Sequence, residues 1–451
     1  MEYEKQPPSS APKLKPRLVI HGGAGNIQPT YPPETYQAYR TALLTIISAT
    51  NAFMTGAKSP SALAIATHAV AQLEDNPLFN SARGAVFTRD GINQLEASVM
   101  VSRGAAKRAV GVMGLRRVRN PILLARRILE HGNADLSASS SSYASAGAAG
   151  GSPLDVPSAQ GHTQIWGDAA EQLAGMYGLD MVDPGYFFTQ RRWDEHVRAL
   201  GREARGEGVC SWAADEYLPQ GTCGAVAMDA EGVICVATST GGMTNKLTGR
   251  VGDTPVPGAG FWAEEWTEEG DPTGRGFWGR VRAAVSASSA PLVTLTEPLR
   301  GVLADCLPTP YLYSPLGSRT TTTTRSMGVS GTGNGDSFLR IAAVHTVAAM
   351  ARWKPEPTSL ALTHVTGPDG ELQRSAGDRW GRTGEGEGGM IGIESVVVRD
   401  AEGRVVDARS EVIMDYNCGG MFRAWIDDEG EPVMSIWTNG GPDKSIDGAL
   451  V

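Results

Sequence analysis

The stretch of sequence that decides the fold is GTCGAVAMDAEGVICVATSTGGMTNKLTGRVGDTPVPGAG, residues 221–260. Two apolar runs, Ala225–Met228 and Val233–Ser239, flank the turn sequence DAEG and predict a β-hairpin. Thr222 follows a glycine at the start of the first strand, and Thr240 ends the second. A threonine in a strand is ordinary, because β-branched residues favour strands. The two threonines become a candidate site only together with the residues around them.

Similar turns recur near the C-terminus, with DAEG at Asp400–Gly403 and DDEG at Asp427–Gly430. Each lies between two short strand-like runs, so the sequence predicts three hairpins and an antiparallel sheet. A further short strand is expected at Arg17–Ile20. Helical patterns occupy Pro33–Met54, Ser61–Leu73, Asn120–His131, Asp168–Tyr177, Gln190–Arg205 and Asp336–Trp353. This mixture indicates an α/β fold in which helices cover a sheet sandwich.

Composition excludes several classes of protein. The 451 residues allow two to four domains of ~100–200 residues, or one enzyme fold with long insertions. The net charge of −9, without a long basic run, argues against nucleic-acid and anionic-membrane partners. No apolar stretch approaches the ~20 residues that cross a bilayer. The five cysteines are odd in number and scattered, which favours the cytoplasm, and the seven histidines form no H-E-x-x-H zinc motif.

Four segments depart from this regular pattern. Residues 1–16 are polar and proline-rich, and we expect a disordered lead. Residues 133–161 consist mostly of Ser, Ala, Gly and Pro, which predicts a flexible insertion. A larger insertion is expected at 262–325, including the five threonines Thr320–Thr324, and a more charged one at 367–389. The 262–325 insertion fits a lid or partner surface as well as an inert surface loop.

Further motifs surround the 221–260 block in a fixed order along the chain. They are LVIHGGAG (Leu18–Gly25), LFNSARGAVFTRDG (Leu78–Gly91), VRNPILLARRILE (Val118–Glu130) and SGTGNGD (Ser330–Asp336). Together they resemble the plant-type L-asparaginase / isoaspartyl peptidase family of threonine N-terminal-nucleophile hydrolases, from Leu18 to about Trp437. The resemblance implies a four-layer αββα sandwich. It also implies hydrolysis of the side-chain amide of L-asparagine and of β-aspartyl (isoaspartyl) peptides.

The resemblance further implies that the precursor cuts itself between Gly221 and Thr222. A threonine hydroxyl is a poor nucleophile without an adjacent base. The freed α-amino group, with a reference pKa of ~7.7–8.0, would serve as that base. Cleavage would leave an alpha subunit of residues 17–221 and a beta subunit of residues 222–451, which together form one catalytic domain. An α/β heterodimer that pairs into an (αβ)₂ assembly is expected.

Catalytic roles follow from the matched positions. Thr222 resembles the nucleophile, and Thr240 the residue that holds its hydroxyl. Thr332 and Gly333 would form the oxyanion hole, as a glycine-rich turn can offer convergent N–H groups. Asn80 resembles a residue that supports autoprocessing.

Substrate roles follow in the same way. Arg250 would bind the substrate α-carboxylate, because a planar guanidinium suits a carboxylate. Asp253 would bind the α-ammonium group, together with the carbonyl of Gly335. The chemistry needs no cofactor. The resemblance nevertheless implies a structural sodium ion, held by main-chain carbonyls of the 73–83 loop at Leu73, Glu74, Asn76, Phe79, Ser81 and Arg83.

Three other residues could suggest Cys/His or acid/base chemistry, namely His21, Cys223 and Glu74. We expect His21 to be a structural residue of the HGGAG loop. Cys223 should point to the opposite face of its strand from Thr222, because side chains alternate along a strand. It should therefore pack in the core.

Some positions depart from the family pattern, and some related activities stay open. Ala82 and Arg83 stand where a glycine and a small or apolar residue are usual, Asn334 replaces a threonine, and Phe261-Trp262 replaces a smaller residue and a tyrosine. The alternatives are an aspartylglucosaminidase-like enzyme, which usually carries a signal peptide and disulfides, a threonine-aspartase-like enzyme, and a processing-deficient binding homologue.

Overall fold

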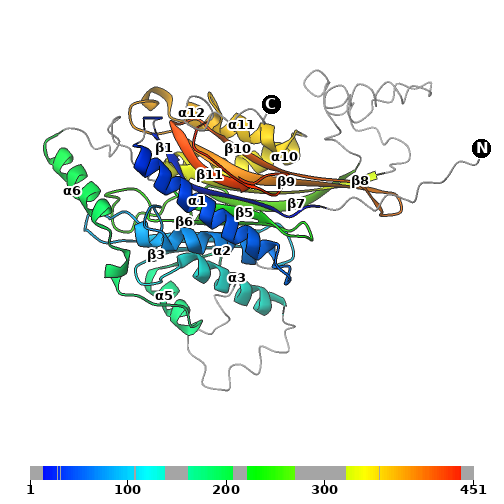
Figure 1. Cartoon of the computed structure of the whole chain (residues 1–451), viewed down its shortest axis with the longest axis horizontal. Coiled ribbons are helices and arrows are strands. Elements are labelled where there is room, and N and C mark those ends of the chain that lie inside the picture. The colour runs from blue at the N-terminus through cyan, green and yellow to red at the C-terminus, as the bar shows by residue number, and fades with distance from the viewer. Residues whose placement is uncertain are drawn as a thin grey trace, which may run out of the picture.

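A computed structural model describes residues 14–27, 29–30, 32–105, 108–137, 161–206, 221–269, 321–354 and 356–437. Within them the chain forms two β-sheets and a set of helices, the mixed α/β architecture that the sequence predicts (Figure 1). Of the predicted disordered lead, residues 1–13 lie outside the described part of the chain.

The larger sheet has the strand order β12-β11-β1-β5-β6-β2-β3-β4, and its neighbours are antiparallel except for the parallel pair β3 and β4. Its strands are β1 (Arg17–Gly25), β2 (Leu95–Val101), β3 (Ala109–Leu115), β4 (Gln164–Trp166), β5 (Cys223–Met228), β6 (Ile234–Thr240), β11 (Gly420–Ile426) and β12 (Pro432–Ser435). Because β1 lies between β5 and β11, the sheet interleaves segments from before and after residue 221.

The smaller sheet is antiparallel with the order β10-β9-β8-β7. Its strands are β7 (Phe261–Glu269), β8 (Thr321–Gly333), β9 (Gly388–Asp400) and β10 (Val405–Tyr416). Strands β7, β8 and β9 contact strands β1, β2, β5 and β6, so the two sheets face each other.

Helices cover the outer faces of both sheets (Figure 1). On the larger sheet lie α1 (Pro33–Met54), α2 (Ala62–Asp75), α3 (Pro121–Ser137) and α5 (Gly167–Met176), and α6 (Gln190–Ala204) extends beyond them. On the smaller sheet lie α10 (Ala343–Trp353) and α11 (Thr358–Thr366), beside α9 (Gly335–Ile341) and α12 (Glu371–Arg374). Among the described helices, none has the length and apolar character needed to cross a bilayer.

Three buried clusters explain why the central strands are apolar throughout. One lies between the larger sheet and its helices, one between the sheets, and one between the smaller sheet and its helices. Along β5, Cys223, Ala225 and Ala227 belong to the first cluster. Val226 and Met228 belong to the cluster between the sheets. A strand buried on both faces needs apolar residues at every position.

The three predicted hairpins are confirmed as β5–β6, β9–β10 and β11–β12. In each turn the aspartate side chain accepts hydrogen bonds from two backbone N–H groups, two and four residues further on. The turn glycines, Gly232, Gly403 and Gly430, have φ values of +77°, +80° and +92°. A glycine adopts this left-handed region without steric cost, which is why the similar turn sequences give the same turn.

The helix predicted over Asp336–Trp353 is wrong as one unit. Ala342 has φ 45° and ψ 54°, so the segment divides into α9 and α10. The N–H groups of Val344 and His345 donate to the carbonyls of Ala259 and Gly258, at 3.4 and 2.8 Å. A distant loop thus satisfies the donors at the start of α10, a contact that helical periodicity cannot reveal.

The predicted insertions also need correction at their ends. Strand β7 continues to Glu269 and β8 starts at Thr321, so both ends of the 262–325 segment are paired strands, and residues 270–320 lie outside the described part. The threonine run was interpreted as a loop, but threonine is β-branched and suits a strand. The 133–161 segment begins inside α3, with residues 138–160 undescribed, and the 367–389 segment contains α12 and the start of β9.

Arg325, inside the predicted larger insertion, is a buried residue of strand β8. Its side chain is fully buried, and Nε donates to Glu394 Oε1 at 3.1 Å. It also donates to the carbonyls of Ala351 and Glu356, at 2.7 and 2.9 Å, and its guanidinium stacks over Trp266. The residue therefore joins the smaller sheet to α10 and the start of α11.

We expect Arg325→Ala to lower the free energy of unfolding by about 3–5 kcal/mol, because it leaves the carboxylate of Glu394 buried without its cation. Urea denaturation measures the change. The matched control is Arg404→Ala, which breaks an exposed pair with Asp400 and should cost no more than about 0.5 kcal/mol. Equal losses in the two variants would contradict the role assigned to Arg325.

Candidate active site

Gly221 and Thr222 lie at the entrance to β5, in the space between the two sheets. Val226 and Met228 of β5 face the smaller sheet, and alternation places Thr222 on the same side. The Thr222 residue is buried. A β-carbon on Gly221 would lie 2.5 Å from the nitrogen of Ala24 and 2.6 Å from the α-carbon of Gly23, and would also collide with the hydroxyl of Thr332. Only glycine fits immediately before Thr222.

The hydroxyl of Thr222 has a partner that the sequence analysis missed. Its Oγ1 lies 2.9 Å from Oγ1 of Thr254. Thr240 lies at the same end of the hairpin, since Cys223 pairs with Ser239. The Thr240 hydroxyl accepts a hydrogen bond from the N–H of Gly242, at 2.9 Å. The predicted role of Thr240 toward Thr222 stays a prediction.

Asn80 holds the turn that follows Thr240. Its Nδ2 donates to the carbonyl of Gly242 at 2.7 Å, and its own carbonyl accepts from the N–H of Gly241 at 3.1 Å. Its Oδ1 accepts from the N–H of Val86 at 3.0 Å. Asn80 thus fixes the end of the hairpin where Thr222 and Thr240 lie.

Thr332 and Gly333 end strand β8 of the smaller sheet, and the Thr332 side chain lies against Gly221. The Thr332 hydroxyl accepts from the N–H of Ala24 at 3.3 Å, and a β-carbon on Gly221 would strike it. Nearby, Nε2 of His21 lies 2.7 Å from Oγ of Ser330. These two contacts join β1 to β8, so the two sheets are connected at the Gly221–Thr222 peptide.

The structure brings the predicted substrate residues together. Nη2 of Arg250 donates to Oδ1 of Asp336 at 2.8 Å. A β-carbon on Gly335 would collide with Oδ1 of Asp253 and lie 3.2 Å from Nη2 of Arg250, so Gly335 packs against both. The side chain of Arg250 is 18% exposed. The cluster offers one cation and two carboxylates beside Thr332 and Gly333.

Two buried charges support the loop that carries this cluster. The Glu96 carboxylate accepts the N–H of Gly252 at 3.1 Å. Nζ of Lys246 lies 3.8 Å from Glu96 Oε1 and donates to the carbonyl of Gln94 at 2.9 Å. A charged residue inside the apolar strand LEASVMV was the signal that could have identified Glu96.

Burial changes the protonation of several groups. Burial raises the pKa of Asp253 to about 7, although the cation of Arg250 acts in the opposite direction. Burial lowers the pKa of His21 to about 3, which keeps this imidazole neutral. Cys223 packs in the core as predicted, and burial raises the pKa of its thiol to about 12. A thiol with that pKa is no nucleophile at neutral pH.

The 73–83 loop offers main-chain carbonyl oxygens, which are the type of ligand that a hard cation prefers. The carbonyls of Leu73, Asn76, Phe79 and Ser81 each accept one backbone N–H, which leaves each a second lone pair. The loop begins at the C-terminal end of α2, where the helix dipole favours a cation. These carbonyl oxygens are therefore of the kind that can coordinate a sodium ion. Within the described part of the chain, no three His, Cys, Asp or Glu side chains are grouped as metal ligands.

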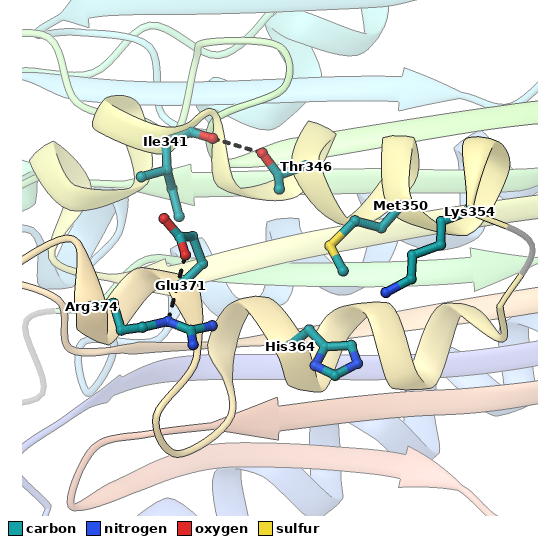
Figure 2. Close-up of a pocket in the computed structure, with 7 residues that line it drawn as sticks. All are labelled: Ile341, Thr346, Met350, Lys354, His364, Glu371 and Arg374. Carbon is teal, nitrogen blue, oxygen red and sulfur yellow. Dashed lines mark hydrogen bonds and ion pairs between the residues drawn. The ribbon is translucent and has the colours of Figure 1, made fainter. Parts of the chain in front are cut away.

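A surface cavity of about 440 Å³ lies elsewhere, between α9, α10, α11 and α12 (Figure 2). Figure 2 shows Lys354, His364 and Arg374 around it, and Arg374 pairs with Glu371 at 3.6 Å. None of the predicted site residues lines this cavity. It is therefore distinct from the cluster around Thr222.

A family model described as "Asparaginase" matches residues 14–150 and 153–278. The chain therefore belongs to the asparaginase family, a family of hydrolases, as the sequence predicted.

Several named proteins are similar in sequence to this chain. The chain is 37% identical over 259 residues to the isoaspartyl peptidase of Escherichia coli, a match that covers 57% of this chain and 71% of the relative. It is 33% identical over 253 residues to the plant-type L-asparaginase of Pyrococcus furiosus, covering 55% and 70%. A probable isoaspartyl peptidase/L-asparaginase 2 of Arabidopsis thaliana is 24% identical over 443 residues, covering 93% and 98%.

Glu74, which lies in the last turn of α2, should make stability depend on pH. Burial raises its pKa from 4.5 to about 8, although its Oε1 accepts hydrogen bonds from Ser239 and from the N–H of Ile122. The folded protein keeps this proton, whereas the unfolded chain releases it above pH 4.5. The group therefore lowers the free energy of unfolding progressively as pH rises from about 4.5 to about 8.

Between these pH values, Glu74 should lower the free energy of unfolding of the wild-type protein by on the order of a few kcal/mol. We expect Glu74→Gln, which mimics the protonated acid, not to show this decrease. Urea denaturation at a series of pH values measures the effect. Glu402→Gln, at an exposed side chain, should keep the wild-type slope. Parallel stability curves for wild type and Glu74→Gln would show that Glu74 is ionised in the folded protein.

Proposed function

We propose that this protein hydrolyses the side-chain amide of L-asparagine and the β-aspartyl bond of isoaspartyl peptides, with Thr222 as nucleophile after self-cleavage. Relatives named isoaspartyl peptidase and L-asparaginase support the substrate class. One observation carries the proposal. The Thr222 hydroxyl, the charged cluster of Arg250 and Asp253, and the Thr332–Gly333 end of β8 come together around the Gly221–Thr222 peptide.

The proposed reaction is an acyl transfer in two steps. After cleavage, the α-amino group of Thr222 takes the hydroxyl proton, and Oγ1 attacks the side-chain carbonyl carbon of the substrate. Thr332 and Gly333 would stabilise the oxyanion, and the amine leaves with the proton. Water then hydrolyses the ester, releasing aspartate and restoring the hydroxyl.

The substrate cluster matches an amino acid that carries both of its α-charges. The α-carboxylate would bind the Arg250 guanidinium, displacing or sharing the contact with Asp336. The α-ammonium would bind Asp253, and the ammonium charge would favour the ionised form of this carboxylate. A substrate held at both charges presents its side-chain carbonyl at a fixed distance from Thr222.

We also propose the assembly that such self-cleavage implies. The alpha subunit (17–221) and beta subunit (222–451) would remain one catalytic domain, because β1 pairs with both β5 and β11. The contacts between the sheets and their helices support a four-layer αββα arrangement of the N-terminal-nucleophile type. Two such heterodimers would form the (αβ)₂ assembly implied by the family resemblance.

A structural sodium ion and a cytoplasmic location complete the proposal. Sodium would bind main-chain carbonyls of the 73–83 loop and rigidify the loop that leads to Asn80, without taking part in the reaction. The free thiols of Cys223, Cys235 and Cys418 support a reducing compartment.

Thr222→Ala removes the attacking hydroxyl and should remain a single chain without amidase activity. Thr222→Ser keeps a hydroxyl and should still be cut, at a reduced rate. Denaturing electrophoresis and N-terminal sequencing measure the cut, which should give a fragment beginning Thr-Cys-Gly-Ala. Wild type is assayed with L-asparagine, a β-aspartyl dipeptide and an N-glycosylated asparagine.

The outcome of this test separates two of the alternatives from the proposed activity. An uncut, inactive wild type would favour a binding homologue, and selective turnover of the glycosylated substrate would favour the aspartylglucosaminidase-like activity. Hydrolysis of L-asparagine by a wild-type chain that stays uncut, or by Thr222→Ala at the wild-type rate, would falsify the mechanism.

Arg250→Ala should impair turnover but leave self-cleavage largely intact, because no α-carboxylate is present during processing. Loss of a charge-assisted contact should cost roughly 2–4 kcal/mol, or about 30- to 1,000-fold in kcat/KM. Arg340→Ala, which removes an arginine of α9 paired with Glu385, is the control and should change kcat/KM less than about threefold. Unchanged kcat/KM in Arg250→Ala would remove Arg250 from the substrate site.

A further inference from the structure

Thr254 lies against the nucleophile. Its Oγ1 is 2.9 Å from Oγ1 of Thr222, and the two residues are 1% and 6% exposed. Thr254 comes from the loop after Asp253, whereas Thr222 precedes strand β5. The tertiary fold, and not a local turn, brings the two hydroxyls together.

The position of Thr254 is fixed by the larger sheet. Its carbonyl accepts a hydrogen bond from Ser98 Oγ of β2 at 2.7 Å, and Thr238 Oγ1 of β6 lies 3.4 Å from the same oxygen. Ser98 and Thr238 face each other in the β2–β6 register, and their hydroxyls are also hydrogen-bonded. A residue held by two central strands places its hydroxyl with little freedom.

The contact between the hydroxyls of Thr254 and Thr222 is present in the uncut chain. Before cleavage, the nitrogen of Thr222 is part of the Gly221–Thr222 peptide, so no α-amino group is available to orient or deprotonate the hydroxyl. The hydroxyl of Thr254 is within hydrogen-bond distance in that state. When Thr222 donates and Thr254 accepts, the Thr222 proton points toward Thr254 and its lone pairs are directed elsewhere.

We propose that Thr254 is a positioning residue for self-cleavage, whose hydroxyl orients the hydroxyl of Thr222 for attack on the carbonyl carbon of Gly221. This inference rests on the proposed self-processing function. After cleavage the same contact would orient the nucleophile toward substrate. Because Asp253 and Thr254 are consecutive, one loop would position both the substrate and the nucleophile.

The bonds in this step balance without another reactant except water. Thr222 Oγ1 forms a bond to the Gly221 carbonyl carbon, and the bond from that carbon to the Thr222 nitrogen breaks. The hydroxyl proton ends on the nitrogen, which becomes the α-amino group. Water then hydrolyses the ester, giving the Gly221 carboxylate and the free hydroxyl. Thr254 gains and loses no atom.

The test compares Thr254→Val, which has nearly the same shape without the hydroxyl, with Thr254→Ser, which retains it. Full-length chains are made by cell-free translation, and the cut fraction is followed over time by denaturing electrophoresis. We expect Thr254→Val to be cut at least about tenfold more slowly than wild type, since about 1.4 kcal/mol corresponds to a tenfold change. Thr254→Ser should be cut within about threefold of the wild-type rate.

A matched control tests whether loss of any buried hydroxyl has this effect. Thr366→Val makes the same change at a buried threonine, whose hydroxyl donates to the carbonyl of Leu362 within α11. It should be cut at the wild-type rate. Once cut, Thr254→Val should have a lower kcat than wild type with L-asparagine, and its KM should stay within about twofold of the wild-type value. The reason is that the Thr254 hydroxyl contacts the nucleophile and is not one of the groups proposed to bind the substrate charges.

Each outcome decides the inference. Cleavage of Thr254→Val at the wild-type rate overturns it, while the proposed function stands if wild type is cut and active. A wild type that is never cut overturns self-processing and this inference together. If Thr254→Val fails to fold, as judged by circular dichroism and Tm, Thr254→Ser and Thr254→Ala replace it. Equal cleavage rates in that pair, which differ by one hydroxyl, overturn the inference.

Discussion

The rest of the structure depends on the close approach of three backbone segments at Gly221. A β-carbon there would meet Gly23, Ala24 and Thr332, and Gly23 itself has φ +119°, a conformation that favours glycine. The two glycines let β1 and the residue before Thr222 come together beside the end of β8. The His21–Ser330 contact joins the sheets at the same place. The peptide proposed to be cut is therefore held by strands from both sheets.

Several ionisable side chains are buried around the Gly221–Thr222 peptide, and their desolvation costs free energy. Glu96, Lys246 and Asp253 are buried, and burial lowers the pKa of Lys246 and raises that of Asp253. Buried charges seldom stabilise a fold, since desolvation offsets much of their attraction. Groups with such shifted pKa values gather at functional sites, where a ligand can supply the missing charge. An α-amino acid carries a carboxylate that complements Arg250 and an ammonium group that complements Asp253.

Much of the fold was readable from local sequence. The Asp–x–x–Gly hairpin turns and the helix over Pro33–Met54 depend on contacts within a few residues, so they formed where they were predicted. Segments whose structure depends on distant partners were misread. The threonines of β8 have the β-branched side chains of a strand, but the run lies in a sheet because β7 and β9 pair with it on both sides. The break at Ala342 depends on carbonyls supplied by residues 258 and 259.

By itself the sequence determined the family, the glycines at the Gly221–Thr222 peptide and the candidate residues Thr222, Arg250 and Asp253, because each belongs to a motif of fixed spacing. Only the tertiary structure decided what these side chains touch. Thr254 reaches Thr222 because strands β2 and β6 hold its carbonyl, and Asp336 reaches Arg250 because β8 ends beside the loop. Spacing along the chain fixes which groups are present. Hydrogen bonds between strands that are distant in sequence fix the distances between these groups. Local sequence patterns cannot predict such distances.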